Sequence, residues 1–195
     1  MTRPQKPNFL FIQTDQMTAF ALSHYGNPVV KTPNLDKLAA RGVVFQNAYC
    51  NNPICASSRF SMMSGQLSSR VGAYDNAAEF PAQVPTFAHY LVDQGYHTCL
   101  SGKMHFVGPD QLHGFQERVT TDIYPSDFGW TPDWLAEGHQ LPPSGMSMRS
   151  VVEAGISERS LQIDYDEEAC HQAEVKLWDY ARNSPDQPFF LAVSF

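Results

Sequence analysis

The stretch Asn8-Phe-Leu-Phe-Ile-Gln-Thr14 is a short, nearly continuous apolar run close to the start of the chain. Such a run is typical of a strand that is buried on both faces of a parallel sheet. Asp15 would then lie at the carboxyl end of this strand. A second run of the same kind, Pro188-Phe-Phe-Leu-Ala-Val-Ser-Phe195, predicts another buried strand.

Helical periodicity alternates with short apolar segments between these two runs. Strands that alternate with helices argue for an α/β fold, with a mainly parallel sheet flanked by helices and its chemistry at the carboxyl ends of the strands. The segment from about 108 to 160 contains many Pro, Gly and Ser residues, and we expect it to be an irregular substrate-loop insertion. The sequence predicts helices at 34–41, about 57–64, 86–94 and 166–182, and strands at 43–45 and 96–101.

Composition describes a globular chain of 195 residues that is 43% hydrophobic and carries a formal net charge of -7. Its 13 basic residues are scattered, which argues against nucleic acid as a partner. No stretch approaches the about 18 consecutive apolar residues of a membrane span, and residues 1–7 lack the pattern of a signal peptide, so we do not expect export by that route. Four cysteines in such a chain are typical of reduced thiols, so we expect a cytoplasmic protein that does not bind membranes.

The chain ends on the predicted strand at 188–195, without a following loop or helix. A strand is a poor place for a natural domain to finish, because its edges then lack cover. We therefore expect residues 1–195 to be the N-terminal portion of a longer catalytic domain, incomplete at the C-terminus. We also expect this portion alone to be inactive and marginally folded.

Residues 53–59 place Cys55 just before a predicted helix and Arg59 one turn later. Both side chains can then project toward the same side of the helix N-terminus. The free N–H groups and the helix dipole attract an oxyanion there, and an arginine adds donors suited to sulfate or phosphate. The alternative is a small buried cysteine beside an ordinary surface arginine.

Residues 102–105, with the sequence Gly-Lys-Met-His, follow the predicted strand at 96–101. On an extended chain Lys103 and His105 would face together while Met104 faces away, which makes a candidate charge clamp and proton-transfer group. The alternative is that both side chains decorate the surface. Asp15 could likewise be a cap or turn residue, and Asp75-Asn76 an ordinary turn pair.

Taken together, these motifs resemble the sulfatase family of the alkaline-phosphatase-like superfamily. The order of the motifs makes the match specific, and it covers essentially the whole chain. Within the family, the likeness to choline sulfatases rests on residues 72–76, 102–106 and 122–134. The family landmarks correspond here to Phe9–Asp15, Thr32-Pro-Asn-Leu-Asp36, Cys55-Ala-Ser-Ser-Arg59, Ser64-Gly65, Pro85-Thr86, Gly95-Tyr96 and Gly102-Lys-Met-His105.

The resemblance implies a specific chemistry. A maturation enzyme would oxidise Cys55 to formylglycine, whose hydrate attacks the sulfur of a small sulfate ester such as choline sulfate. Arg59 and Lys103 would hold the hydrate and neutralise charge, and His105 would assist proton transfer. A calcium ion would be held by Asp15 and the nucleophile derived from Cys55, with later ligands beyond residue 195.

The resemblance also suggests which residues recognise the substrate. Trp130 would face the quaternary ammonium of choline, although it could equally be a packing residue, and Asn76 could donate to a sulfate oxygen. The full-length relatives assemble through C-terminal segments, so a homo-oligomer is expected. Two positions depart from the family pattern, since Ser57 stands where the signature has proline and Gln16 where many members have a second metal-binding aspartate.

Two other functions remain open. A phosphodiester or phosphonate ester hydrolase of the same superfamily can share this nucleophile position and metal chemistry. A cysteine-dependent phosphatase is disfavoured, because its loop needs more residues between cysteine and arginine to wrap the phosphate. The second open alternative, of a different class, is that the chain is a truncated, non-catalytic remnant.

Overall fold

The computed structural model describes residues 6–124 and 149–195. They form two compact units, one of residues 6–13, 51–124 and 149–195 and the other of residues 14–50. The second unit holds the short helices η1 (Ala19–Ala21), η2 (Ser23–Tyr25) and α1 (Pro33–Ala39). The first unit contains β1 (Phe9–Gln13), α2 (Cys55–Ser64), α3 (Ser68–Val71), α4 (Phe87–Asp93), β2 (His97–Gly102), β3 (Glu117–Arg118), α5 (Arg149–Val152), α6 (Leu161–Asn183) and β4 (Phe189–Ser194).

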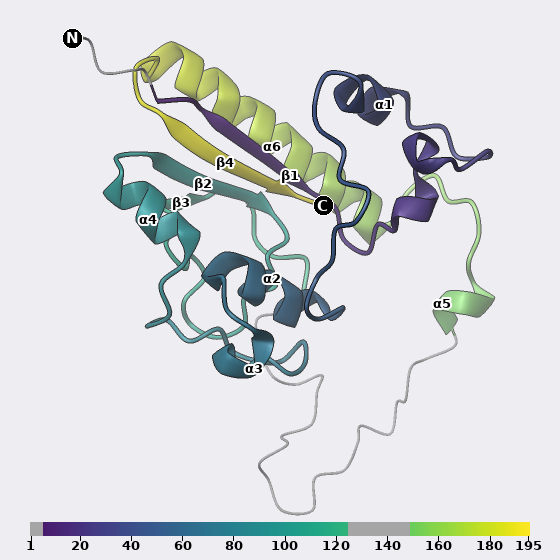
Figure 1. The fold of residues 1–195 in the computed structure, drawn as a ribbon, viewed down its shortest axis with the longest axis horizontal. Coiled ribbons are helices and arrows are strands. Elements are labelled where there is room, and N and C mark those ends of the chain that lie inside the picture. The colour runs from purple at the N-terminus through teal and green to yellow at the C-terminus, as the bar shows by residue number, and fades with distance from the viewer. Residues whose placement is uncertain (1–5, 125–148) are drawn as a thin grey trace, which may run out of the picture. The chain divides into compact units, whose positions relative to one another are not determined.

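The four described strands form one parallel sheet in the order β1-β4-β2-β3. The strand nearest the end of the chain, β4, lies between β1 and β2 (Figure 1). Its register pairs Ser194 with Gln13 on one side and with Gly102 on the other. The carboxyl ends of β1, β4 and β2 therefore meet at one edge, as the α/β prediction requires.

Helices cover both faces of this sheet, and the two faces of β4 enter different cores (Figure 1). Phe190 and Ala192 join the aromatic core beneath α2 and α4, whereas Leu191 and Val193 pack against α6. This alternation is the period of two that a strand buried on both faces shows. The sheet is thus the middle of three layers, which confirms the predicted fold class.

The first strand is less buried than its sequence predicts. Phe9, Leu10 and Ile12 keep 42%, 50% and 57% of their surface exposed. The reason is the strand order, because β1 pairs only with β4 within the described residues. The prediction of burial on both faces is therefore wrong for β1.

The expectation that the last strand lacks cover is also wrong. Phe190, Leu191 and Val193 are buried at 9%, 0% and 4% exposure, since β1 and β2 flank β4 and helices cover it. The apolar surface that remains exposed on the sheet belongs to β1 instead.

Several other predictions need correction. No strand forms at 43–45 in the described chain, where Val43 and Phe45 are 80% and 70% exposed. Five short elements have no counterpart in the predictions, namely η1, η2, α3, β3 and α5, and the last two lie inside the expected irregular segment. The remaining predicted helices and strands form close to the expected residues.

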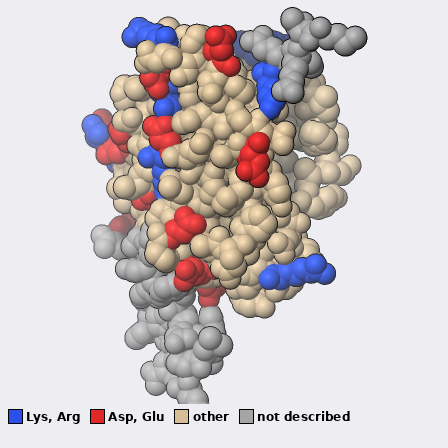
Figure 2. All heavy atoms as spheres, turned by 90° about the vertical axis from the view of Figure 1, so that its left-hand side faces the viewer, with Lys and Arg blue, Asp and Glu red and all other residues tan. Residues whose placement is uncertain are grey.

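The surface of the described residues carries charges of both signs. Figure 2 shows acidic and basic side chains interspersed on one face, with wide uncharged areas between them. None of the helices described here is long and apolar enough to cross a membrane. The four cysteines all lie in the described chain, and none of them forms a disulfide there.

Candidate active site

The candidate site lies where β2 ends against β4 and the N-terminus of α2. Lys103 directly follows β2, and its N–H donates to the carbonyl oxygen of Ser194 at 2.8 Å. Gly102 precedes it with a φ of +97°, and a Cβ built there would lie 1.9 Å from the same carbonyl oxygen. Only glycine permits this close passage. The end of β2 is thereby fixed against β4, and Lys103 is delivered to the site.

Cys55 is the first residue of α2, so the helix begins two residues earlier than predicted. The N–H of Ala56 donates to Asn76 Oδ1 at 3.0 Å, which caps the helix with a side chain from another segment. The first helical bond runs from Ser58 N to Ile54 O at 2.8 Å. Lys103 Nζ lies 3.8 Å from Cys55 Sγ. A half-buried thiol thus lies at a helix N-terminus beside an ammonium group, where negative charge is favoured.

Arg59 lies one turn further along α2 and is only 2% exposed. Its Nη1 donates to the carbonyl oxygen of Lys103 at 2.7 Å and to Ser194 Oγ at 2.8 Å. The same nitrogen lies 3.4 Å from Gln13 Oε1 at the end of β1. The alternative of an ordinary surface arginine is therefore wrong. This guanidinium ties α2 to the carboxyl ends of three strands.

Lys103 and His105 are brought together, at 5% and 2% exposure. Lys103 Nζ lies over the Tyr124 ring at 4.6 Å, and the His105 ring is 5.5 Å from that ring. Met104 joins the hydrophobic core, consistent with the prediction that it faces away from Lys103 and His105. The alternative of surface decoration is wrong. The backbone is not extended, however, because His105 has a φ of +63°.

Asn76 connects the histidine to the helix that carries Cys55. His105 Nε2 lies 3.1 Å from the carbonyl oxygen of Asn76, whose side chain caps α2. Since a carbonyl only accepts, Nε2 carries the hydrogen and Nδ1 is the basic nitrogen of the neutral ring. Burial, and next the Lys103 charge, lower the pKa of His105 below its ordinary value, so the ring is neutral at pH 7.

The residues that gather here do not by themselves fit a calcium ion. Calcium takes about six to eight oxygen ligands, whereas the side chains around Cys55 are mainly cationic. No group of three or more His, Cys, Asp or Glu side chains that could hold a metal occurs among the described residues. Asp15 follows β1 by two residues but belongs to the unit of residues 14–50. Trp130 lies outside the described residues.

Sequence reasoning missed three residues that shape the site. Ser194 and Tyr124 reach it only through strand pairing and loop folding, so no local pattern marks them. Asp122 accepts hydrogen bonds from the N–H groups of Met104 and His105 at 3.0 and 2.6 Å. It opens the stretch 122–134 that carries part of the family resemblance, and that was its only signal.

Comparison with known proteins gives matches along the whole chain. The family model described as Sulfatase matches residues 7–195. Choline-sulfatase of Rhizobium meliloti (strain 1021) is 48% identical over 193 residues, which are 97% of this chain and 38% of the relative. Arylsulfatase A of Bos taurus is 38% identical over 219 residues, covering 97% of this chain and 43% of the relative. The chain therefore spans about two fifths of these relatives' length.

Solved structures show the same fold. One is the structure of a protein in complex with its substrate, D-glucosamine-2-N,6-O-disulfate. It has a TM-score of 0.67 and 25% sequence identity, and the match covers 97% of this chain and 34% of that protein's chain. The phosphonate monoester hydrolase of Agrobacterium radiobacter has a TM-score of 0.66 and 24% identity, over 97% of this chain and 40% of its own. At that identity the second likeness concerns the fold alone.

Proposed function

Because the chain belongs to the sulfatase family, we propose that it supplies the nucleophile side of a sulfuric ester hydrolase site that acts on choline-O-sulfate. One observation carries the proposal: Cys55 opens α2 with Lys103 Nζ 3.8 Å from its sulfur. The 48% identity with a choline-sulfatase supports the choice of substrate.

The nucleophile is formylglycine derived from Cys55. A maturation enzyme oxidises the thiol by two electrons with an external oxidant, and the sulfur leaves as sulfide. One oxygen of the aldehyde hydrate then forms a bond to the sulfur of the ester, and the S–O bond to the alcohol breaks. Loss of the proton from the second hydroxyl re-forms the aldehyde as sulfate leaves, and water restores the hydrate. The net reaction consumes one water per ester.

Lys103 and the N-terminus of α2 provide the positive potential that holds the sulfate group. The ammonium lies beside the Cys55 sulfur, so it can neutralise charge that develops on the hydrate or on the ester oxygens. Arg59 helps to position this ammonium, because its hydrogen bond to the Lys103 carbonyl oxygen fixes the backbone that carries the lysine side chain. Asn76 could add a side-chain N–H toward a sulfate oxygen.

His105 moves the proton when the sulfated intermediate collapses. Its neutral ring carries the hydrogen on Nε2, held by the Asn76 carbonyl, which leaves Nδ1 to accept the proton of the hydroxyl. A lowered pKa keeps this nitrogen unprotonated at pH 7. A calcium ion, with Asp15 among its ligands, would need most of its oxygens from outside this cluster, so no step above passes through it.

The remaining features of the proposal come from the family. Trp130 would recognise the quaternary ammonium through its ring face. The segment from about 108 to 160 would then be the substrate loop of the catalytic domain to which residues 1–195 belong. A formylglycine-forming enzyme would be a maturation partner, the location would be cytoplasmic, and the full-length protein would be a homo-oligomer.

A second candidate function is hydrolysis of phosphonate or phosphate esters. Its support is the cationic cluster beside Cys55, which suits any tetrahedral oxyanion. Transition-state charge differs between the two ester classes, so relative turnover separates them.

The test compares the full-length protein with its Cys55→Ala and Cys170→Ala variants. Cys170 is the matched control, because it is an exposed free thiol on α6 outside the site. We expect Cys55→Ala to abolish sulfate release from choline sulfate and Cys170→Ala to leave it unchanged. Undiminished sulfate release by Cys55→Ala would refute the nucleophile. Faster turnover of a phosphonate ester than of choline sulfate by the unmutated protein would favour the second candidate, and no turnover of either would favour the remnant.

A further inference from the structure

The loop that carries Lys103 and His105 is held from outside by one carboxylate. Asp122 Oδ2 accepts the N–H of Met104 at 3.0 Å and the N–H of His105 at 2.6 Å. The start of the loop is held by the same segment, since Gly102 N donates to Thr120 Oγ1 at 2.6 Å. Gly102, Met104 and His105 thus donate their N–H groups to the side chains of Thr120 and Asp122, while the N–H of Lys103 donates to Ser194.

The conformation of His105 requires such support. Its φ of +63° is unfavourable for a residue with a Cβ, and such conformations persist where surrounding contacts fix them. A carboxylate oxygen that accepts two consecutive N–H groups selects this turn against the extended alternative. In an extended chain, successive N–H groups would point in opposite directions.

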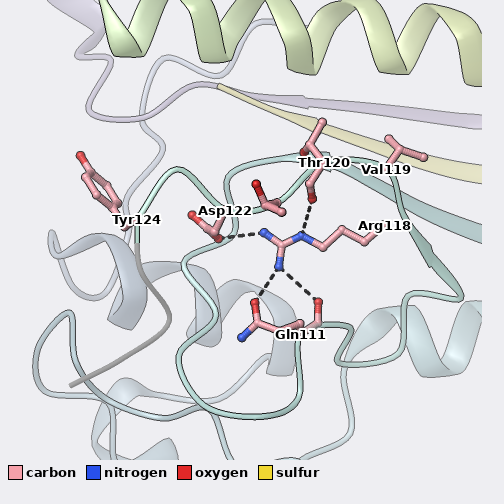
Figure 3. Close-up of a pocket in the computed structure, with 7 residues that line it drawn as sticks. Gln111, Arg118, Val119, Thr120, Asp122 and Tyr124 are labelled. Carbon is pink, nitrogen blue, oxygen red and sulfur yellow. Dashed lines mark hydrogen bonds and ion pairs between the residues drawn. The ribbon is translucent and has the colours of Figure 1, made fainter. Parts of the chain in front are cut away.

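The carboxylate is itself held in place by a buried guanidinium. Arg118 Nη2 lies 3.0 Å from Asp122 Oδ2, and the two side chains are 8% and 3% exposed. Arg118 Nε donates to the Thr120 carbonyl at 3.0 Å, and Nη1 donates to Gln111 Oε1 at 3.0 Å (Figure 3). This fork leaves the arginine little freedom to rotate, so the position of Asp122 is determined by its partner.

We propose that Asp122, oriented by Arg118, is the positioning residue that sets Lys103 and His105 against the nucleophile; this rests on the function proposed above. Asp122 need not touch the substrate. It acts through the backbone of residues 104 and 105, and through the field of its charge at the histidine.

The negative charge of Asp122 predicts an effect on the pH–activity profile that a simple loss of stability would not produce. The groups that act on the His105 ring are Lys103 and Arg59, which lower its pKa, and Asp122 and the Asn76 carbonyl, which raise it. Removal of the Asp122 charge should therefore lower the pKa of His105 further. The acid limb of the pH–activity profile should then move to lower pH.

The experiment uses Asp122→Asn and Asp122→Ala in the full-length protein, with Asp110→Asn as matched control. Asp110 has the same local chemistry outside the site, because it accepts the N–H groups of Leu112 and His113 at 2.9 and 3.0 Å. The measurements are kcat and KM for choline sulfate, their pH dependence, and amide hydrogen exchange at residues 104 and 105.

We expect Asp122→Ala to lower kcat about 100-fold with a smaller change in KM, as displacement of reacting groups by about 1 Å does. Asp122→Asn keeps an acceptor, so it should lose less kcat while shifting the acid limb to lower pH. Both variants should exchange the amides of residues 104 and 105 faster. Asp110→Asn should change none of these.

An Asp122→Asn variant with the unmutated pH profile and unmutated amide protection would overturn the proposal. So would equal effects of Asp122→Asn and Asp110→Asn on kcat. If the unmutated protein hydrolyses no sulfate ester, the proposed function fails by itself. Amide exchange and an NMR titration of His105 then still decide whether Asp122 positions the loop.

Discussion

Substitution of Gly102 by alanine should reduce both stability and turnover more than the same substitution at an uncrowded glycine with a positive φ. The added Cβ would lie 1.9 Å from the Ser194 carbonyl oxygen and 2.8 Å from its carbon. Ordinary van der Waals contact needs a further separation of about 1.5 Å. Because Gly102 opposes Ser194 in the sheet, the chain can gain that space only by moving the end of β2, and Lys103 with it.

Two costs add at this position. Overpacking of a close contact typically costs about 1–3 kcal/mol, and a positive φ on a residue with a Cβ adds about 1 kcal/mol. We therefore expect Gly102→Ala to reduce the free energy of unfolding by about 3 kcal/mol. The displaced Lys103 should lower kcat for choline sulfate by about 100-fold, since errors of about 1 Å in placement have that effect.

Gly65→Ala is the matched control for this variant. Gly65 has a φ of +67° at the end of α2, and no atom lies within 4 Å of a Cβ built there. It should cost only about 1 kcal/mol and leave turnover intact. The assay is chemical denaturation of both variants beside sulfate release. Equal losses in Gly102→Ala and Gly65→Ala would refute the argument, because the clash would then contribute nothing.

Three further predictions follow from burial and charge. Ser57→Ala should raise the free energy of unfolding by about 1 kcal/mol, because Ser57 Oγ is buried without a hydrogen-bond partner in the described part of the chain; a lower melting temperature would contradict this. Burial lowers the pKa of His113 from its ordinary 6.5, so in acid the unfolded chain binds more protons than the folded chain. The free energy of unfolding should therefore fall as the pH drops below 6.5. Equal midpoints of urea unfolding at about pH 7.5 and about pH 5.5 would contradict this. Trp130→Ala should raise KM for choline sulfate about 30-fold, matching a cation–π contact of about 2 kcal/mol, and spare an uncharged aryl sulfate; equal losses on both substrates would indicate structural damage instead.

Local sequence patterns predicted most of the elements and the cluster of charged groups. Residues 55–59 lie on one helix, so their spacing brings Cys55 and Arg59 to the same end of it. Lys103 and His105 follow one strand as predicted, but on a backbone that turns at His105 and is not extended. The apolar runs at 8–14 and 188–195 likewise predicted two strands of the sheet. These features depend on neighbours in the chain, which a sequence displays directly.

What the sequence could not show depends on contacts between distant segments. Strand order decides that β1 is exposed and β4 is central, although both runs predict a buried strand. The hydrogen bond from Arg59 to Ser194 joins residues 135 positions apart, and no pattern in either segment predicts it. Asp122 is similar, because a carboxylate that accepts N–H groups from a loop looks like any surface aspartate in the sequence.

The central claim is that Cys55 becomes the nucleophile of a sulfate ester hydrolase. Mass spectrometry of the peptide that contains Cys55, from full-length protein that releases sulfate from choline sulfate, tests it most directly. The account predicts an aldehyde at this position, trapped by a carbonyl reagent. An unmodified thiol at Cys55 in an active preparation would contradict it.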